Sequence, residues 1–162
     1  ASMTIFKNGG STVGEIRTST TATQYLTSSD YRLKENVTSI TDGIVRVKQL
    51  KPSRFNFIAD SGTTLDGFLA HETQTVVPES VSATKDATRD IGTIKDADGN
   101  VIDTNVEESA KENGQTWEKT ATENVYQGID QAKLVPLLTA ALQEAITKIE
   151  TLETKVTALE SK

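Results

Sequence analysis

The pattern of apolar and polar positions divides the chain into four stretches of different character. In residues 1–28, Thr, Ser and Gly surround short apolar pieces such as Ile5-Phe6 and Val13. β-Branched residues and the glycine pair Gly9-Gly10 favour strands and turns over helix there. Because such a polar stretch cannot bury enough apolar surface to fold alone, we expect it to be the β-rich end of something larger or a set of strands shared between chains.

Residues 29–82 predict a small core that begins with a helix. Ile44, Val47 and Leu50 are spaced to share one helical face. Thr41 or Asp42 can cap that helix, and Pro52, which cannot occupy a helix interior, ends it near Leu50.

Two more apolar segments follow in the same region. Ser53 to Ile58 alternates as a strand does, with Phe55 and Phe57 on one face. Leu65 to Val77 forms a second apolar cluster, which Pro78 ends.

Residues 83–124 differ sharply in composition from the preceding region, because they are polar and charged. Within them, residues 92–103 resemble a β-hairpin whose turn, Asp98-Gly99, supplies positive φ angles. The alternative is a disordered loop. Because of the β-branched flanks on both sides of the turn, the hairpin is the preferred interpretation.

The same turn has acidic residues at alternate positions, as a calcium loop does. Asp96, Asp98 and Asn100 have the required spacing, and Glu107 occupies the twelfth position. Val101, however, stands where the loop needs a glycine for its sharp bend. We therefore do not expect calcium here, or any other metal.

The last stretch predicts one long helix that continues from Pro136 to the end of the chain. Apolar residues at alternating three- and four-residue intervals are typical of a coiled coil, here over residues 137–162. The a and d positions are Leu138, Leu142, Ala145, Ile149, Leu152, Val156 and Leu159.

Charges beside this stripe predict how several copies would associate. In a parallel arrangement Lys148 faces Glu153 of a neighbouring copy and Lys155 faces Glu160, although each exposed pair contributes only about 0.2–1 kcal/mol. Ile146 at an e position widens the stripe and favours three strands. The alternative is a single amphipathic helix that packs on its own domain.

Composition and charge narrow the classes of function. Hydrophobic residues make up 35% of the chain, with four Phe, three Tyr and one Trp, which favours stabilisation by oligomer contacts. The net charge of −6 disfavours nucleic acid as a partner. We see no secretory signal and no stretch apolar enough to cross a membrane. The lack of cysteine excludes disulfides and fits folding in a reducing cytosol.

Few residues in the chain could carry chemistry. His71 is the single histidine and lies with Glu72 in a mostly apolar segment, where a lone His is usually structural. No phosphate-binding loop is present, and we expect no cofactor. A hydrolytic site would therefore need another base. A buried lysine can fill that role beside a serine nucleophile, because burial disfavours the charged ammonium.

Several ordered blocks resemble the peptidase S74 family, the C-terminal intramolecular chaperone domain of phage endosialidases, tail fibres and tailspikes. The opening motif is the segment Thr27-Ser28-Ser29-Asp30-Tyr31-Arg32-Leu33-Lys34-Glu35-Asn36-Val37. The blocks that follow in the family's order are residues 42–52 with Phe55, 67–72, 77–79, 125–126, 134–138 and 142–144. Residues 10–16 resemble the last turns of a fibre.

This resemblance implies an activity and a site. Ser29 is the nucleophile, Lys34 is its base, and the Ser28–Ser29 bond is cut once by an enzyme that cleaves only itself. Asp30 and Asn36 are the nearest polar residues that could orient groups, although Asp30 could equally well cap a helix. His71 and Glu72 are further supporting residues. His71 departs from the Gln that many relatives have.

The resemblance also implies an organisation and partners. Residues 1–28 end the fibre passenger, residues 29–162 are the chaperone domain, and the 83–124 insertion can form an arm that reaches back onto the passenger. The fold class is α+β, with a small helical and β core, the polar hairpin-like insertion and a parallel trimeric coiled coil. The partners are two further copies and the upstream passenger. Assembly takes place in the host cytoplasm, the passenger joins the virion tail, and the chaperone leaves.

Regular structure would not bring Ser29 and Lys34 together. Five residues apart, they point about 140° apart on a helix and to opposite faces of a strand. They can meet only across a bend or between chains of a trimer, which leaves open a dyad that forms only on assembly. Two other functions remain open: a structural trimerisation tip that is never cleaved and, less favoured because aromatic residues are few, a receptor-binding tip.

Overall fold

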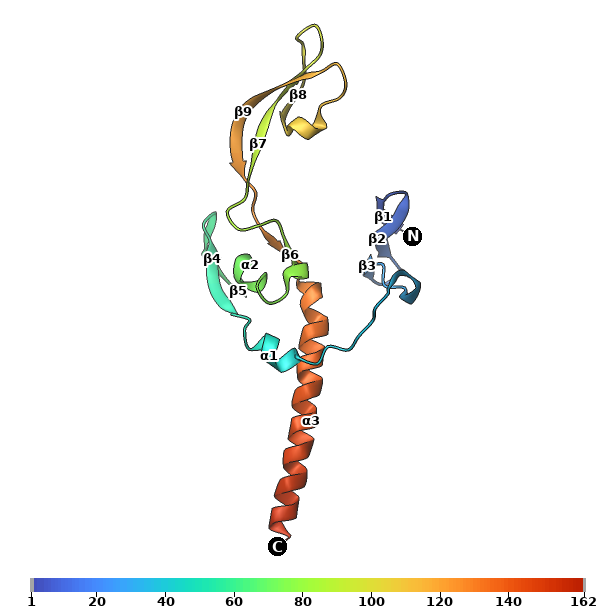
Figure 1. Ribbon diagram of the computed structural model, residues 1–162, viewed down its shortest axis with the longest axis vertical. Coiled ribbons are helices and arrows are strands. Elements are labelled where there is room, and N and C mark those ends of the chain that lie inside the picture. The colour runs from blue at the N-terminus through green and yellow to red at the C-terminus, as the bar shows by residue number, and fades with distance from the viewer. Residues whose placement is uncertain (1, 162) are drawn as a thin grey trace. The chain divides into compact units, whose positions relative to one another are not determined.

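The computed structural model describes residues 2–161, which form two compact units that divide between residues 39 and 40. In the first, three antiparallel strands pair in the order β1 (Ser2–Asn8), β2 (Ser11–Thr18) and β3 (Thr23–Thr27). A short 3-10 helix, η1 (Tyr31–Leu33), follows (Figure 1). The strands predicted for residues 1–28 are therefore confirmed.

The second unit is a mixed α and β core with several small antiparallel sheets. Helix α1 (Gly43–Val47) leads into the hairpin of β4 (Ser53–Phe57) and β5 (Asp60–Gly67). Helix α2 (Ala70–Thr73) and the 3-10 turn η2 (Pro78–Ser80) come next. Strand β6 (Val81–Ser82) pairs with β10 (Gly128–Ile129), and a last turn, η4 (Gln131–Leu134), opens helix α3 (Val135–Glu160).

A compact apolar cluster holds these elements at the start of α3. Val77 and Leu137 are almost fully buried, at 1% and 2% exposure, and they pack with Val76 and Leu134. The half-buried side chains of Val47, Leu50 and Phe68 lie against the cluster. The core is small, as the low apolar content predicted.

Helix α1 is shorter than predicted and is capped differently. It ends at Val47 instead of Leu50, and Asp42 makes no side-chain bond to the helix. Instead, the Glu144 carboxylate on α3 accepts hydrogen bonds from the backbone N–H of Gly43 at 2.6 Å and of Ile44 at 3.2 Å. The prediction of a local cap was wrong, because a residue about 100 positions later in the chain satisfies these donors.

The close approach of α1 and α3 depends on the absence of a side chain at Gly43. A Cβ built there would lie 2.4 Å from the backbone nitrogen of Ala141, well inside van der Waals contact. Ala140 and Ala141, both buried, are the small residues of α3 that face α1. Any larger residue at position 43 would push the two helices apart.

The β4–β5 hairpin confirms the predicted strand and its aromatic face. The rings of Phe55 and Phe57 meet edge to face with centroids 5.4 Å apart. Gly67 on the facing strand lies over the Phe55 ring, where a Cβ would approach to 3.1 Å.

The polar insertion is an ordered arm of three antiparallel strands. Strand β7 (Thr88–Lys95) lies between β8 (Val101–Val106) and β9 (Thr116–Asn124), and the 3-10 turn η3 (Glu108–Ala110) follows β8. The predicted hairpin is thus confirmed, and a third strand, not foreseen, completes the sheet.

The arm has its own small core, built around its tryptophan. Ile91 and Ile94 are buried, and the Trp117 indole lies over Gly92, where a Cβ would come within 2.5 Å of the ring. The indole N–H also donates to the Val106 carbonyl at 3.0 Å. The arm therefore folds around a few apolar residues in an otherwise polar segment.

The turn of the arm differs in detail from the prediction. Gly99 alone has a positive φ, 86°, and Asp98 does not. The Asp96 carboxylate accepts from the backbone N–H of Asp98 and Asn100 and from the Asn100 side chain. The spacing that resembled a calcium loop is therefore used to close a turn. Within residues 2–161, no cluster of three or more His, Cys, Asp or Glu side chains could hold a metal ion.

Helix α3 confirms the predicted C-terminal helix over 26 residues. In its first turns it packs on the core through Leu137, Ala140 and Ala141, so the alternative of a helix that packs on its own domain holds for that face only. Of the helices described, none is both long and apolar enough to cross a membrane.

Candidate active site

The residues around the Ser28–Ser29 bond lie where a sheet changes into a turn. Beyond the end of β3, the Ser28 backbone N–H still donates to the Val13 carbonyl on β2 at 3.2 Å, and its hydroxyl donates to the Thr12 carbonyl at 3.3 Å. Ser28 is thus tied to the sheet of the first unit, whereas Ser29 begins the turn. The Ser28–Ser29 peptide bond therefore links the sheet to the turn.

The turn itself is held by Asp30. Its carboxylate accepts from the backbone N–H of Arg32 at 2.9 Å, which caps the start of η1. The Asp30 and Tyr31 carbonyls accept from the backbone N–H groups of Leu33 and Lys34, both at 3.1 Å. The capping role weighed for Asp30 in the sequence is therefore what the structure shows.

This turn brings Ser29 and Lys34 together. Lys34 Nζ donates a hydrogen bond to Ser29 Oγ over 2.8 Å. The two side chains meet across a bend within one chain, which is one of the two arrangements that the spacing allowed. The heavy-atom geometry is also that of the reverse bond, in which a serine hydroxyl donates to a neutral amine.

The pair is open to solvent in the single chain. Ser29 and Lys34 are both exposed, and so are apolar neighbours, with Tyr31 at 81%, Leu33 at 73% and Val37 at 79%. A lysine acts as a base near neutral pH when its surroundings disfavour the ammonium, which water does not do. The geometry of a dyad is present, but the low-dielectric environment is not.

The other predicted supporting residues have structural contacts. Asn36, with φ at 53°, turns the chain after η1 in the left-handed conformation that Asn tolerates. Its predicted role in orienting groups at the site stays a prediction.

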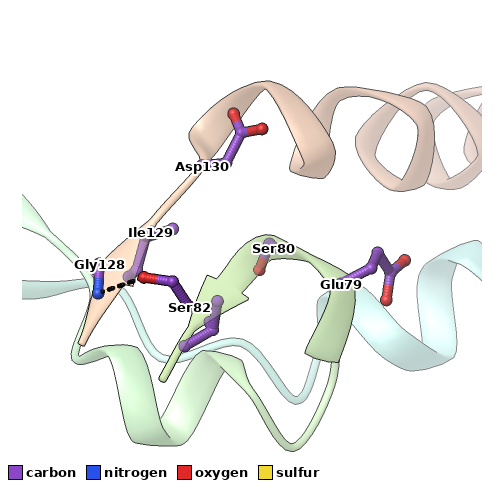
Figure 2. A pocket seen from close by; sticks show the side chains of 7 residues that line it. Glu79, Ser80, Ser82, Gly128, Ile129 and Asp130 are labelled. Carbon is purple, nitrogen blue, oxygen red and sulfur yellow. Dashed lines mark hydrogen bonds between the residues drawn. The ribbon is translucent and has the colours of Figure 1, made fainter. Parts of the chain in front are cut away.

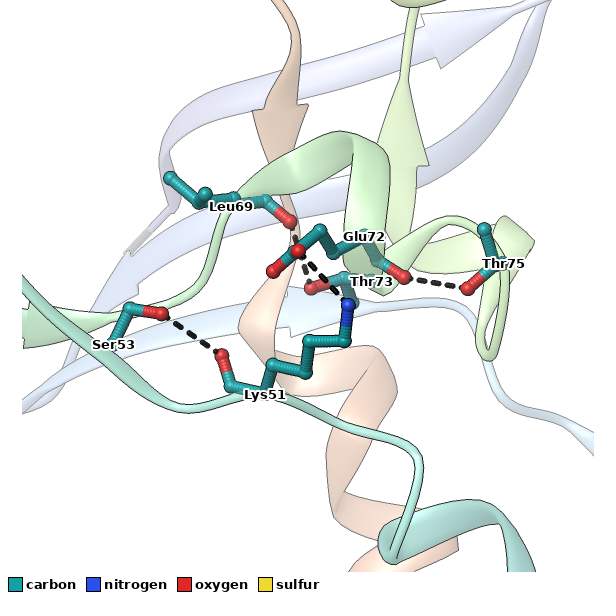
Figure 3. A network of polar contacts seen from close by, with 6 residues as sticks. All are labelled: Lys51, Ser53, Leu69, Glu72, Thr73 and Thr75. Atoms are coloured by element: carbon teal, nitrogen blue, oxygen red, sulfur yellow. Dashed lines mark hydrogen bonds and ion pairs between the residues drawn. The ribbon is translucent and has the colours of Figure 1, made fainter.

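Glu72 belongs to a polar network that joins α2 to the segment before β4 (Figure 3). Its carboxylate pairs with Lys51 at 3.0 Å, and its carbonyl accepts from the Thr75 hydroxyl at 2.7 Å. The Thr73 hydroxyl donates to the Leu69 carbonyl in the same network. These bonds fasten α2 in the second unit, whereas the Ser29–Lys34 contact lies in the first.

His71 lines a hollow of about 400 Å³ at the root of the arm, together with Tyr126 and the ion pair of Lys85 and Asp86. Sequence reasoning had named His71 without these neighbours. The chain turns sharply beside this hollow, where Ala83 and Asp86 have φ angles of 60° and 59°, unusual for residues with side chains. No signal in the sequence indicated these turns.

A second hollow, of about 390 Å³, lies where β6 meets β10 (Figure 2). Several of its polar groups bond to the chain itself: Gly128 N–H donates to Ser82 Oγ at 3.1 Å, and Ser80 Oγ donates to a carbonyl at 2.7 Å. The Asp130 carboxylate caps η4 through Ala132 N–H. These bonds join the elements that line the hollow.

The face of α3 opposite the core carries an apolar stripe that has no partner in the described chain. Leu142, Ile149 and Leu152 are 61%, 54% and 59% exposed. Leu138, Ile146, Val156 and Leu159 extend the stripe, and Ala145 within it is half-buried. These are the predicted a, d and e positions. Assembly into a trimeric coiled coil stays a prediction, because the structure is that of one chain.

Comparison with known families identifies the segment that contains Ser29 and Lys34. Residues 29–82 match the family model of peptidase S74, described as the chaperone of endosialidase. The resemblance noted in the sequence is confirmed over these residues, and the description of the family supports a chaperone role. No curated protein matches the chain.

Proposed function

We propose that the chain is a self-cleaving intramolecular chaperone that promotes folding and trimerisation of a phage tail fibre or tailspike and then cuts itself free. The observation that carries the proposal is the 2.8 Å contact of Lys34 Nζ with Ser29 Oγ. It lies in the first residues of the segment that matches the chaperone family, directly after the bond to be cut.

The chemistry uses Ser29 on its own peptide bond. Neutral Lys34 accepts the hydroxyl proton as Ser29 Oγ attacks the Ser28 carbonyl carbon. The bond from that carbon to the Ser29 nitrogen breaks, and the nitrogen takes the proton back from Lys34, which leaves an ester between Ser28 and the Ser29 oxygen. Water hydrolyses the ester to a Ser28 carboxylate and a free Ser29 hydroxyl. The enzyme acts once, on itself.

Ser28 is suited to its place in this reaction. Its bonds to Val13 and Thr12 hold the acyl side of the scissile bond on the sheet, while the Asp30 cap holds the nucleophile's side in the turn. Anchoring both sides limits the motion of the attacking oxygen relative to the carbonyl carbon, which lowers the entropic cost of reaction.

The homotrimer supplies what the single chain lacks. Three copies would join along the α3 stripe, with Lys148 facing Glu153 and Lys155 facing Glu160. Contacts between the first units of the three copies would cover Tyr31, Leu33 and Val37, which are exposed in the single chain. Burial would remove water from Lys34 and favour its neutral form. Cleavage would then follow assembly, so that the chaperone is released only from a trimeric passenger.

The same order of events sets the location of each part. Folding and cleavage take place in the host cytoplasm, residues 1–28 stay with the passenger in the virion tail, and residues 29–162 leave. No cofactor enters any step.

A denaturing gel of folded protein tests the proposal. The parent should yield a fragment that begins at Ser29, and Ser29→Ala and Lys34→Ala should remain whole. Lys7→Ala, which removes an exposed lysine of β1 in the same unit, is the matched control and should cleave as the parent does. A parent that stays whole while trimeric would favour the alternative, a structural trimerisation tip, which the exposed α3 stripe also supports.

A further inference from the structure

Ser29 has a competitor for the Lys34 side chain. Asp30 follows Ser29 directly, and a carboxylate forms a stronger, charge-assisted hydrogen bond with an ammonium than a neutral hydroxyl does. On charge alone, Lys34 should turn to Asp30. Nevertheless, Lys34 Nζ contacts Ser29 Oγ.

Arg32 explains this choice, because it occupies both oxygens of Asp30. Arg32 Nε donates to Oδ1 at 2.9 Å and Nη2 donates to Oδ2 at 2.7 Å, while the Arg32 backbone N–H takes a further position on Oδ1. This two-pronged geometry suits the planar guanidinium and is not available to a lysine.

The electrostatics of the pair agree with the geometry. Arg32 lowers the pKa of the Asp30 carboxyl below its ordinary value through its side-chain hydrogen bonds, and Asp30 raises the pKa of Arg32. Asp30 therefore stays ionised and paired with Arg32 at neutral pH.

We infer that Arg32 is a positioning residue of the proposed cleavage site, which holds the Asp30 carboxylate away from Lys34 so that Lys34 remains available to Ser29. The inference rests on the proposed function and deepens it. It assigns a role to a residue that the dyad motif alone does not explain, and that role acts through Asp30, without contact with the reacting atoms.

A double-mutant comparison separates this role from simple stiffening of the turn. Arg32→Gln frees the carboxylate, so self-cleavage should slow by about 10- to 100-fold, a typical cost of a misplaced catalytic group. Adding Asp30→Asn removes the competitor but keeps a residue that can cap η1. Arg32→Gln with Asp30→Asn should therefore cleave at least several-fold faster than Arg32→Gln alone.

Two results would overturn the inference. One is an Arg32→Gln variant that cleaves at the parent's rate. The other is a double variant no faster than Arg32→Gln, which is what a clamp that only stiffens the turn predicts. The fraction of trimer, measured by light scattering, must be equal among the variants. Differences in the rate of self-cleavage then reflect the cleavage site alone.

The chain offers a matched control in its second unit. Arg54 donates hydrogen bonds to Asp66 across the exposed β4–β5 hairpin, from Nε to Oδ1 at 2.7 Å and from Nη2 to Oδ2 at 3.0 Å. Arg54→Gln removes an equivalent ion pair and should leave the rate of cleavage unchanged.

A measurement that does not require cleavage keeps the two proposals distinct. If the parent is never cut, the proposed function fails, and the inference is decided by nuclear Overhauser contacts between the Lys34 side chain and the Ser29 β-protons. These contacts should be present in the parent, lost in Arg32→Gln and restored in the double variant. Equal contacts in all three would rule the inference out.

Discussion

The two faces of helix α3 have opposite surroundings. On one face, Leu137, Ala140 and Ala141 are buried in the chain's own core, and Glu144 caps α1. On the other, apolar residues of similar size, such as Leu138 and Leu142, are 48% and 61% exposed. A single helix thus serves as a core element on one side and as an unpartnered apolar surface on the other.

This difference separates the residues that form the core of the single chain from the residues that we expect to contact a partner. A stripe of this length left in water is unusual for a monomer and is typical of an association surface. The core beneath the other face is small. Substitutions on the two sides should therefore have different consequences, and the predictions below are ordered by the size of the expected effect.

The largest effect is expected on the exposed stripe. Leu142→Glu with Ile149→Glu and Leu152→Glu places like charges along the seam, so sedimentation should show a monomer, with circular dichroism of the core preserved. Thr147→Glu with Thr154→Glu, on the outer f positions, is the control and should stay trimeric.

The same triple variant tests the timing of cleavage. If burial in the trimer activates Lys34, the monomer should not cut itself. A monomer that cleaves at the full rate would refute the idea that assembly controls the reaction, although the Ser29–Lys34 contact within one chain would still account for the chemistry.

Neighbouring leucines give the sharpest contrast between the faces. Leu137→Ala removes a side chain that is 2% exposed and should lower the free energy of unfolding by about 2–5 kcal/mol. Leu138→Ala, one residue later, should weaken assembly and leave the stability of a monomeric background nearly unchanged. Denaturant unfolding in the triple-charge background measures both. An equal loss of unfolding free energy in the two variants would mean that the two faces of α3 do not differ.

The joint between α1 and α3 should respond to a single methyl group. Gly43→Ala places a carbon against the Ala141 backbone and should cost about 1–3 kcal/mol, the usual range for overpacking. Glu144→Ala removes the cap of α1 and should cost about 1 kcal/mol. Gly62→Ala, where a Cβ would meet only the tip of the Asp60 side chain at 3.9 Å, is the control for chemical unfolding.

The smallest effect is expected in the arm, at acid pH. Bonds to Lys119 lower the pKa of Asp90, and bonds to Lys95 lower the pKa of Glu118. Because the folded pKa values lie below the unfolded ones, the ion pairs stabilise the arm above the ordinary carboxyl range, about pH 4, and this stability is lost as pH falls through the lowered values.

Trp117, the only tryptophan, reports this transition directly. Its emission should shift to the red below about pH 4 as the indole leaves Gly92. Asp90→Asn with Glu118→Gln should remove most of the pH dependence. A red shift of the same size in that variant would mean that these two carboxylates do not cause the transition.

The sequence predicted α3 and the arm hairpin well because their signals are local. The alternating spacing of apolar residues from Leu138 to Leu159 lies within one continuous segment of sequence. The turn of the arm is likewise indicated by Gly99, which lies in the turn itself. The sequence could not predict that Glu144 caps α1, because the two partners lie far apart in the chain. Nor could it predict that Leu137 and not Leu138 is buried in the core, because this depends on which elements pack against α3.

The candidate site was predicted in its residues but not in its geometry. Ideal helix and strand angles separate Ser29 from Lys34, and only the 3-10 turn capped by Asp30 brings them together. Arg32 was overlooked because its role depends on the direction of a carboxylate, which spacing does not reveal. The roles that the family resemblance implies for Ser29 and Lys34 are therefore the ones that a cleavage experiment must test.

The most direct test of the account is the intact mass of the trimer after folding in ¹⁸O-labelled water. The account predicts two fragments, one that begins at Ser29 without label and one that ends at Ser28 with one labelled oxygen in its new carboxylate. Lys34→Ala should give a single unlabelled chain. A parent that remains whole as a folded trimer, or a Lys34→Ala variant cut at the same bond and rate, would contradict it.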